Sequence, residues 1–383
     1  MRSREAFDFD VVVAGGGIGG LASAAGLRRA GLEVGVFERR APDSADAGVL
    51  ILWSNGVNAL KTLGLAGRVT RHGVPVRDLV FRSWSGRELT RLDLDAMSRD
   101  AGAPSLVIRR RDLLSALKDQ VECSGRERVI GFRQDDAAVT IQLGGGGEVR
   151  ARALVACDGL DSRIRAELVA DGAPREAYQR AWVGSASLRH PSLEDGVTTV
   201  THGSGARFCI ASVCGSEVTW LATINEQRFR HCGEGPAALR RVFADAHEPI
   251  VAILDATPES ETFSTPIRYR PPVERWGRGR VTLLGDAAHP CTPDLAQGAC
   301  QALEDAVVLS RTLTTRADVS AALREYETIR RPHANHVANV SWIVQAQGAE
   351  ESALFGLARD LGTAFFLRSV AAREIAFLLT HRP

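Results

Sequence analysis

The chain has 383 residues, of which 45% are hydrophobic, so it can bury a large core and exceeds the usual single-domain size of about 100–200 residues. Its 47 lysines and arginines nearly balance its 46 aspartates and glutamates, and the arginines are spread along the chain. Because this balance provides no strong basic surface, we expect no nucleic-acid partner.

The cysteines and the chain termini give no sign of secretion or membrane insertion. Seven cysteines are odd in number and none has C-x-x-C spacing, so neither a disulfide framework nor a zinc site is predicted. The start lacks a signal-peptide pattern, and glycines interrupt the apolar run 11–27. The amphipathic stretch 353–379 is expected to pack against the protein rather than lie on a membrane. We therefore expect a cytoplasmic protein without stable membrane insertion; its oligomeric state stays open.

The first 38 residues have the pattern of a strand, a glycine loop, a helix and a second strand. FDFDVVVAG and LEVGVFE are the continuous apolar runs of strands buried on both faces of a parallel sheet, and LASAAGLRRAG between them has helical periodicity. This order predicts a βαβ unit.

The loop of this unit contains G-x-G-x-x-G as Gly15, Gly17 and Gly20, followed by Glu38 at the end of the second strand. The first glycine permits a tight turn, the second lets a pyrophosphate approach the backbone, and the third lets helix and strand pack closely. Helix N-terminal amides then hold the phosphates, and Glu38 can accept hydrogen bonds from a ribose. A dinucleotide site is predicted, with NAD, NADP and FAD all open, although Glu38 disfavours a 2′-phosphate.

The remaining pattern predicts a second domain inserted into the first. A helical segment (55–63), an alternating strand (76–84), a helix opening at 109–117, a hairpin around 144–147 and another buried strand precede residue 175. From 175 to 270 the strands alternate and carry aromatic residues, as in one antiparallel sheet. We predict an α/β fold: a Rossmann-like domain (1–174 and 271–345), an antiparallel-sheet substrate domain (175–270), and a C-terminal helical segment (346–383).

Three motifs, in this order, resemble those of FAD-dependent class A monooxygenases, which have the p-hydroxybenzoate hydroxylase-type fold. They are the glycine fingerprint, ALVACDGLDSRIR (153–165) and VTLLGDAAHPCTPDLAQGACQALEDA (281–306). The resemblance spans the chain to about residue 345, and the third motif is highly specific. Weaker agreement lies in 48–65 and 109–117.

The resemblance implies the residues that bind FAD. Those assigned to the ADP half are Gly15, Gly17, Ile18, Gly19, Gly20, Glu38 and Arg39. Arg110 best matches the arginine that reaches the flavin, with Arg109 and Arg111 as alternatives. Asp158 matches the motif near the pyrophosphate, Gly285 and Asp286 face the ribityl chain, and the amides of Gly298 and Ala299 face the flavin pyrimidine edge. Helix N-terminal amides at that edge suit the negative charge of reduced flavin.

The implied activity is hydroxylation of an aromatic, heteroaromatic or polycyclic small molecule. FAD would be reduced by transiently bound NADH or NADPH and would react with O₂ to give a C4a-hydroperoxide, with no metal required. Two alternatives stay open: an epoxidase of an alkene or quinone-type compound, and a non-catalytic flavin-binding redox sensor. One departure bears on the sensor: many relatives have Asn-x-Gly-Gln-Gly where this chain has Asp294, Leu295, Ala296, Gln297 and Gly298.

Four residues are candidates for the substrate side. Arg207 could clamp a polar ring substituent and Trp220 could stack on a ring, although a solvated strand residue and ordinary sheet core are equal alternatives. Pro293 and Asp294 lie where flavin and substrate should meet, and flavin-dependent urate hydroxylases have a similar Pro-Asp pair with a matching arginine. Asp294 is either a general base toward a phenol or ring N–H, or a helix-entry acid.

Overall fold

The structure is a computed structural model that describes residues 7–39, 48–124, 126–233, 235–352, 362 and 368–382. Part of the C-terminal stretch predicted to be amphipathic (353–361 and 363–367) lies outside the described residues. No helix in the described ranges is long and apolar enough to cross a membrane.

A mixed sheet with four neighbouring parallel strands forms the dinucleotide-binding part, as the βαβ pattern predicted. Its strands run in the order β16-β17-β10-β1-β2, and β8 and β9 extend β10 as an antiparallel arm. The strands are β1 (Phe9–Ala14), β2 (Val34–Phe37), β8 (Val129–Gln134), β9 (Val139–Leu143), β10 (Glu148–Ala156), β16 (Gly277–Arg278) and β17 (Val281–Leu283). The C-terminal parts of β1 (Val11–Ala14) and β10 (Ala153–Ala156) are buried, which explains the continuous apolar sequence of these segments.

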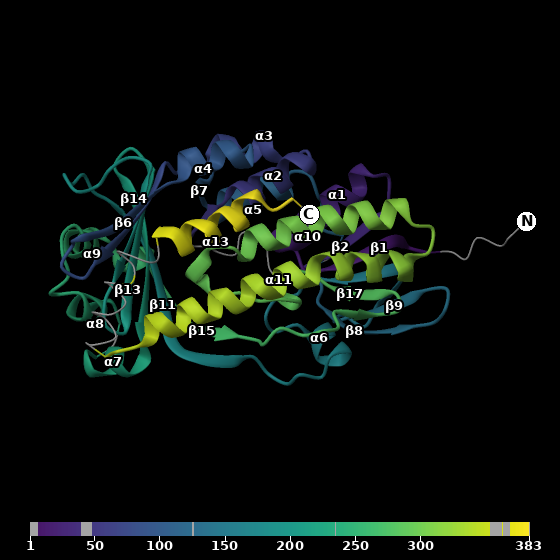
Figure 1. Cartoon of the computed structure of the whole chain (residues 1–383). Coiled ribbons are helices and arrows are strands. Elements are labelled where there is room, and N and C mark those ends of the chain that lie inside the picture. Colours follow the sequence, from purple (N-terminus) through teal and green to yellow (C-terminus); the bar gives the residue numbers. More distant parts are fainter. Residues whose placement is uncertain are drawn as a thin grey trace, which may run out of the picture.

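Helices cover this sheet and join it to the rest of the chain. The glycine loop leads into α1, which packs on α10, and α11 runs beside α10 from the parallel sheet to the second sheet (Figure 1). The helices are α1 (Ile18–Arg29), α2 (Ser54–Thr62), α3 (Ala66–Val69), α4 (Leu94–Ala101), α5 (Arg110–Lys118), α6 (Arg163–Leu168), α10 (Gly298–Thr315), α11 (Val319–Ala349) and α13 (Arg368–Thr380).

The second sheet stands at the other end of the molecule, in the order β15-β11-β14-β13-β12-β5-β6 (Figure 1). Neighbouring strands are antiparallel except for the parallel pair β12 and β5. The strands are β5 (Asp78–Ser83), β6 (Glu88–Asp93), β11 (Arg175–Ser187), β12 (Val197–His202), β13 (Ala206–Cys214), β14 (Glu217–Asn225) and β15 (Thr262–Tyr269). The sheet therefore includes two strands from before residue 175. A third, three-stranded sheet contains β3 (Val49–Leu52), β7 (Leu106–Arg109) and β4 (Val74–Pro75).

The two faces of the second sheet contact different parts of the molecule, because successive side chains along each strand point to opposite faces. One face packs against α7 (Glu226–His231), α8 (Gly235–Val242) and α9 (Ile250–Ala256) around a core that includes Phe208 and Phe243. The opposite face looks toward the dinucleotide-binding part. The fold class predicted from the sequence is confirmed, whereas the exact domain bounds remain predictions.

Candidate active site

One cavity of about 1510 Å³ runs from the glycine loop after β1 to the inner face of the second sheet. It is large enough for a dinucleotide and a small molecule together. Every residue predicted to bind the cofactor borders it: Gly15, Gly17, Ile18, Gly19, Gly20, Glu38, Arg39, Arg110, Asp158, Gly285, Asp286, Gly298 and Ala299. Arg207, Pro293 and Asp294 border the same cavity. The fold thus brings together residues from three distant motifs.

The glycines of the loop meet different surroundings. Gly15 has φ of 112°, and a β-carbon there would lie 2.3 Å from the carbonyl oxygen of Cys157. At Gly20 a β-carbon would lie 2.0 Å from the carbonyl oxygen of Gly15, whereas at Gly17 it would meet no protein atom within 4 Å. Gly15 and Gly20 are therefore required by packing, and Gly17 leaves space in front of the first amides of α1. This space suits a pyrophosphate.

Acidic groups along the cavity also fit a bound dinucleotide. Glu38 Oε2 accepts a hydrogen bond from the Gly16 amide at 2.7 Å, which holds Glu38 beside the loop. Asp158 Oδ2 accepts from the Arg163 amide at 2.9 Å, while its buried Oδ1 has no hydrogen-bond partner within the described part of the chain. Burial raises the pKa of Asp158. A buried oxygen of this kind is expected to meet a ligand group or a water molecule.

Three neighbouring arginines at the start of α5 point in different directions. Arg109 Nε donates to Glu217 Oε1 at 3.0 Å, so this arginine is tied to β14. The side chain of Arg111 is 66% exposed and lies near Asp112. Of the three, Arg110 is the one that borders the cavity, so the contact with flavin stays a prediction for Arg110.

Asp286 projects into the cavity from the short helix η3 (Gly285–Ala287) that follows β17. Neighbouring protein raises the pKa of Asp286, and the charges of His289 and Arg110 partly oppose this effect. The residue is exposed to the cavity, and its carboxyl oxygens can accept hydrogen bonds from a polyol chain beside it.

The loop between η3 and α10 presents the beginning of α10 to the cavity. α10 starts at Gly298, so the amides of Gly298 and Ala299 point toward the space where the sequence placed the flavin. Ala296 adopts a left-handed conformation, with φ of 50° and ψ of 31°. This conformation favours glycine, which accounts for the glycine that many relatives have here. The Trp53 indole donates to the Leu295 carbonyl oxygen at 2.9 Å and holds the loop.

Asp294 and Arg207 form an ion pair at the substrate end of the cavity. Asp294 belongs to the short helix η4 (Pro293–Leu295), and its side chain is 1% exposed. Arg207 comes from β13, and its guanidinium lies over Gly348, where a β-carbon would be 2.6 Å from Arg207 Nε. Arg207 is therefore a buried partner of Asp294, not a solvated strand residue.

The prediction that Trp220 stacks on a substrate ring is wrong. Although Trp220 is among the residues that border the cavity, its indole packs in the core on the outer face of the sheet against Phe208, with ring centroids 5.3 Å apart. Its Nε1 donates to Thr257 Oγ1 at 3.0 Å. Trp220 is ordinary sheet core.

A buried charge network that sequence reasoning missed lies behind the η3 loop. Arg330 donates to Asp305 Oδ1 at 2.7 Å and to Glu304 Oε2 at 2.6 Å, and all three side chains have no solvent exposure. Asp305 Oδ2 accepts from the Gly285 amide at 3.0 Å and contacts His289 Nε2 at 2.6 Å. His289 therefore belongs to the scaffold of the loop. Glu304 and Asp305 fall within the third motif, but Arg330 had no distinguishing pattern around it.

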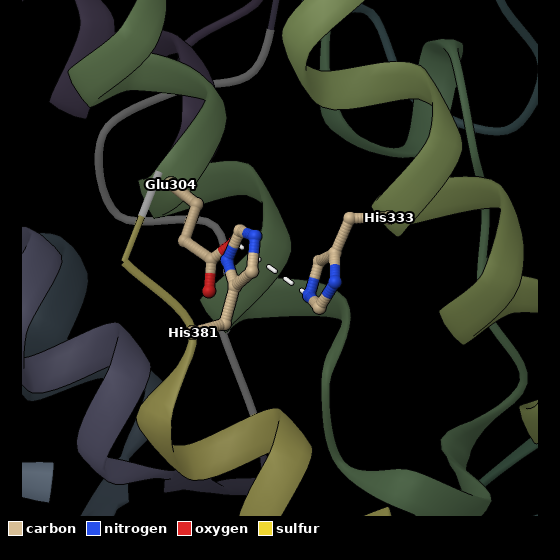
Figure 2. Close-up of side chains that lie close together, drawn as sticks. All are labelled: Glu304, His333 and His381. Atoms are coloured by element: carbon tan, nitrogen blue, oxygen red, sulfur yellow. Dashed lines mark hydrogen bonds and ion pairs between the residues drawn. The ribbon is translucent and has the colours of Figure 1, made fainter.

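His381, close to the C-terminal end of the chain, contacts the same network. His381 Nδ1 lies 2.9 Å from Glu304 Oε2, and its ring stacks on His333, with centroids 3.5 Å apart and planes 7° apart (Figure 2). The potential ligand atoms of Glu304, His333 and His381 lie within 4.8 Å of one another, as in a metal site. However, a metal ion lies in the plane of each coordinating imidazole, and two stacked parallel planes share no such point. Glu304 Oε2 also accepts a hydrogen bond from Arg330, so we interpret the three residues as a contact that holds the C-terminal residues against α10 and α11.

A dinucleotide loop that opens into a cavity walled by a separate sheet is the architecture of an FAD-dependent oxidoreductase. The family model described as FAD binding domain matches residues 8–341. The chain is 35% identical over 349 residues to aurachin C monooxygenase/isomerase of Stigmatella aurantiaca, covering 90% of each chain. It is 30% identical over 346 residues to 6-hydroxynicotinate 3-monooxygenase of Bordetella bronchiseptica, covering 86% of this chain and 90% of that protein.

Among solved structures, HpxO of Klebsiella pneumoniae, complexed with FAD and uric acid, is similar with a TM-score of 0.89 at 25% identity, covering 96% of each chain. The chain therefore belongs to the FAD-binding class A flavin monooxygenase family. It is an FAD-dependent monooxygenase of aromatic or heteroaromatic compounds, and NAD(P)H is the usual reductant of this class. This result decides against the non-catalytic sensor.

Gly17→Ala and Gly20→Ala should separate cofactor binding from folding. Gly17 has φ of −76°, which alanine tolerates, so Gly17→Ala should leave the melting temperature of the FAD-free protein unchanged. Its methyl group would enter the phosphate space and weaken FAD binding about 10-fold or more. Gly20→Ala should instead lower the melting temperature itself, because its methyl group meets backbone. Thermal unfolding and FAD titration measure both effects; equal effects of the two variants would contradict this division.

Ala296→Gly should relieve the left-handed strain in the loop. We expect the free energy of unfolding to rise by about 0.5–1 kcal/mol, because the strain relieved in the folded state exceeds the backbone entropy that glycine adds to the unfolded chain. Denaturant unfolding of the FAD-loaded protein measures the change, with Ala299→Gly, inside α10, as a control that should destabilise. A less stable Ala296→Gly variant would show that the loop is not strained.

His333 should make the fold sensitive to acid. Burial lowers the pKa of His333 to about 4, outweighing the attraction of Glu304. Between about pH 6.5 and 4 the unfolded chain therefore binds more protons than the folded one, and stability falls as the pH falls through this window. His333→Phe should lose less melting temperature between pH 7 and 5 than the wild type, whereas His72→Gln, at an exposed position, should behave as wild type. An equal loss in His333→Phe would contradict the assignment.

Proposed function

We propose that the enzyme hydroxylates a ring compound that carries an ionisable O–H or N–H group, and that Asp294 accepts the proton of that group. The ion pair of Asp294 and Arg207 at the substrate end of the cavity is the observation that carries this proposal. One relative named for action on 6-hydroxynicotinate, and one that binds uric acid, support a heteroaromatic ring.

The cofactor-binding residues are proposed to hold FAD as the resemblance implied. Gly15, Gly17, Gly20 and Glu38 would hold its ADP half, Asp158 the pyrophosphate region, and Asp286 the ribityl chain. Arg110 and the first amides of α10 would face the flavin ring and offset negative charge there. When bound and reduced by NADH or NADPH, the flavin would supply the electrons that activate O₂, so that one oxygen atom goes to the ring and the other leaves as water.

The chain's own chemistry on the substrate side is proton transfer and charge pairing. Arg207 would offset the charge of Asp294 in the carboxylate form, which is the form that can accept a proton from the ring O–H or N–H group. After the transfer, Arg207 can pair with the anionic ring, which is then a better nucleophile toward the activated oxygen. The cavity walls exclude water from this step.

Asp294→Asn should separate flavin chemistry from hydroxylation. We expect the variant to fold and bind FAD, to oxidise NAD(P)H, and to form product about 100-fold more slowly or worse, because general-base assistance contributes about 10²–10⁴-fold. The assay follows NAD(P)H, O₂ and product with 6-hydroxynicotinate, uric acid and aurachin C as trial substrates. Asp95→Asn, at an exposed position of α4, is the matched control. Unchanged product per NAD(P)H in Asp294→Asn would refute the role, and an epoxide product would favour the epoxidase.

A further inference from the structure

Two buried glutamines lie beside Asp294 and have no place in the reaction described so far. Gln345 on α11 is 1% exposed and Gln179 on β11 is 2% exposed. The side-chain amide of Gln345 contacts the carboxyl group of Asp294 on one side and the amide of Gln179 on the other. Buried amides must satisfy both a donor and an acceptor. Gln345 lies between the carboxyl group of Asp294 and the amide of Gln179, so the orientation of its amide decides which of these two groups receives a hydrogen bond.

The head group of Gln345 is held in place by its helix. Ser341, one turn earlier on the same face, donates from Oγ to the Thr292 carbonyl oxygen at 2.8 Å, and the two hydroxyls are also 2.8 Å apart. The end of α11 is fixed to the second sheet, because Asn225 Nδ2 donates to the Ala349 carbonyl oxygen at 3.2 Å. The contact between Gln345 and Asp294 therefore follows from the packing of α11 against both the loop and the sheet.

A half-turn of the last side-chain torsion of Gln345 would exchange its amide nitrogen and oxygen between Asp294 and Gln179. With Nε2 toward the carboxyl group, the amide donates to both oxygens of Asp294, at 3.2 Å from Oδ1, as an ionised Asp294 requires. With Oε1 toward it, the amide would accept from a protonated Asp294 and donate to Gln179.

We propose that Gln345 and Gln179 form an amide relay that holds Asp294 in both of its protonation states. This inference rests on the proposed proton acceptance by Asp294. When the substrate O–H or N–H bond breaks and an O–H bond forms on Asp294, the two amides rotate together, and no proton moves through them. Gln345 then accepts from the acid instead of donating to the carboxylate.

An amide is the side chain that suits this task. Arg207, the charged group that faces Asp294 from β13, supplies only donors and stabilises only the carboxylate. A second carboxylate would repel the ionised form. The glutamines from α11 and β11 add no charge, and each offers both a donor and an acceptor. Gln345 and Gln179 are therefore positioning residues, and Asp294 touches the substrate.

A titration of the FAD-loaded enzyme tests the relay without a substrate. The side-chain amides of glutamine are labelled with ¹⁵N and followed by NMR from pH 9 down to the lowest pH at which the folded enzyme keeps FAD, because a carboxyl group paired with a guanidinium binds its proton at low pH. We expect two glutamine amides to change together with one midpoint, the one donating to the carboxylate being shifted downfield at high pH. Neither should respond in Asp294→Asn. Glutamine amides that do not respond to pH, or that still respond in Asp294→Asn, would overturn the relay.

Gln345→Met gives a second readout from turnover, with whichever trial substrate the enzyme hydroxylates. Methionine has a similar volume but can neither donate to a carboxylate nor accept from an acid. Hydrogen bonds to charged groups are the stronger kind, so the carboxylate loses more than the acid does. The acidic limb of the hydroxylation pH profile should then move up by about one pH unit. Gln227→Met, at an exposed position of α7, should leave the profile unchanged.

The two failures are distinguishable. Suppose that Asp294→Asn uncouples NAD(P)H oxidation from hydroxylation. If the acidic limb of the pH profile of Gln345→Met then matches that of the wild type, and the glutamine amide signals do not respond to pH, only the relay is overturned. If Asp294→Asn remains coupled, the proposed function fails, whatever the amides do. If Gln345→Met does not bind FAD, the titration of the unaltered enzyme decides.

Discussion

The buried ion cluster of Arg330, Glu304 and Asp305 is the constraint on which the site depends. Charges without solvent exposure are costly unless every one is paired and hydrogen-bonded. Here burial would raise the pKa of Asp305, but His289 and Arg330 outweigh it and hold that pKa well below its ordinary value. The cluster thus keeps its charges, and with them it fixes the η3 loop through the Gly285 amide.

The cluster also determines where α10 begins. Asn55 Nδ2 donates to Glu304 Oε1 at 2.6 Å and to Gln297 Oε1 at 3.0 Å, so Arg330, Glu304 and Asn55 lead directly to the residue before Gly298. The first amides of α10 are therefore aimed at the cavity by buried groups one layer behind it. Preorganised amides stabilise developing charge better than mobile ones.

The glycine fingerprint could be predicted from sequence because its requirements are local: a turn, an approach and a packing contact within six residues. The face of a strand is not local. In the observed register Arg207 pairs with Thr223 and Ile210 with Trp220, so Arg207 and Trp220 occupy opposite faces. A shift of one residue would exchange those faces, and no pattern in the sequence specifies it. The ion pair of Arg330 and the amides of Gln345 and Gln179 depend on packing between distant elements, and sequence periodicity does not reveal such contacts.

One helix relates the two halves of the site to each other. Arg330 and Gln345 both lie on α11, and 15 residues at about 1.5 Å per residue place them about 22 Å apart along the helix axis. Arg330, near the middle of α11, holds the ion cluster behind the η3 loop, and the last turns of the helix contact Asp294 and the second sheet. The helix continues past Pro332, which lies between these two positions. The η3 loop and the carboxylate of Asp294 are therefore connected through one continuous helix, and this connection favours the fixed geometry that oxygen transfer between two bound molecules requires.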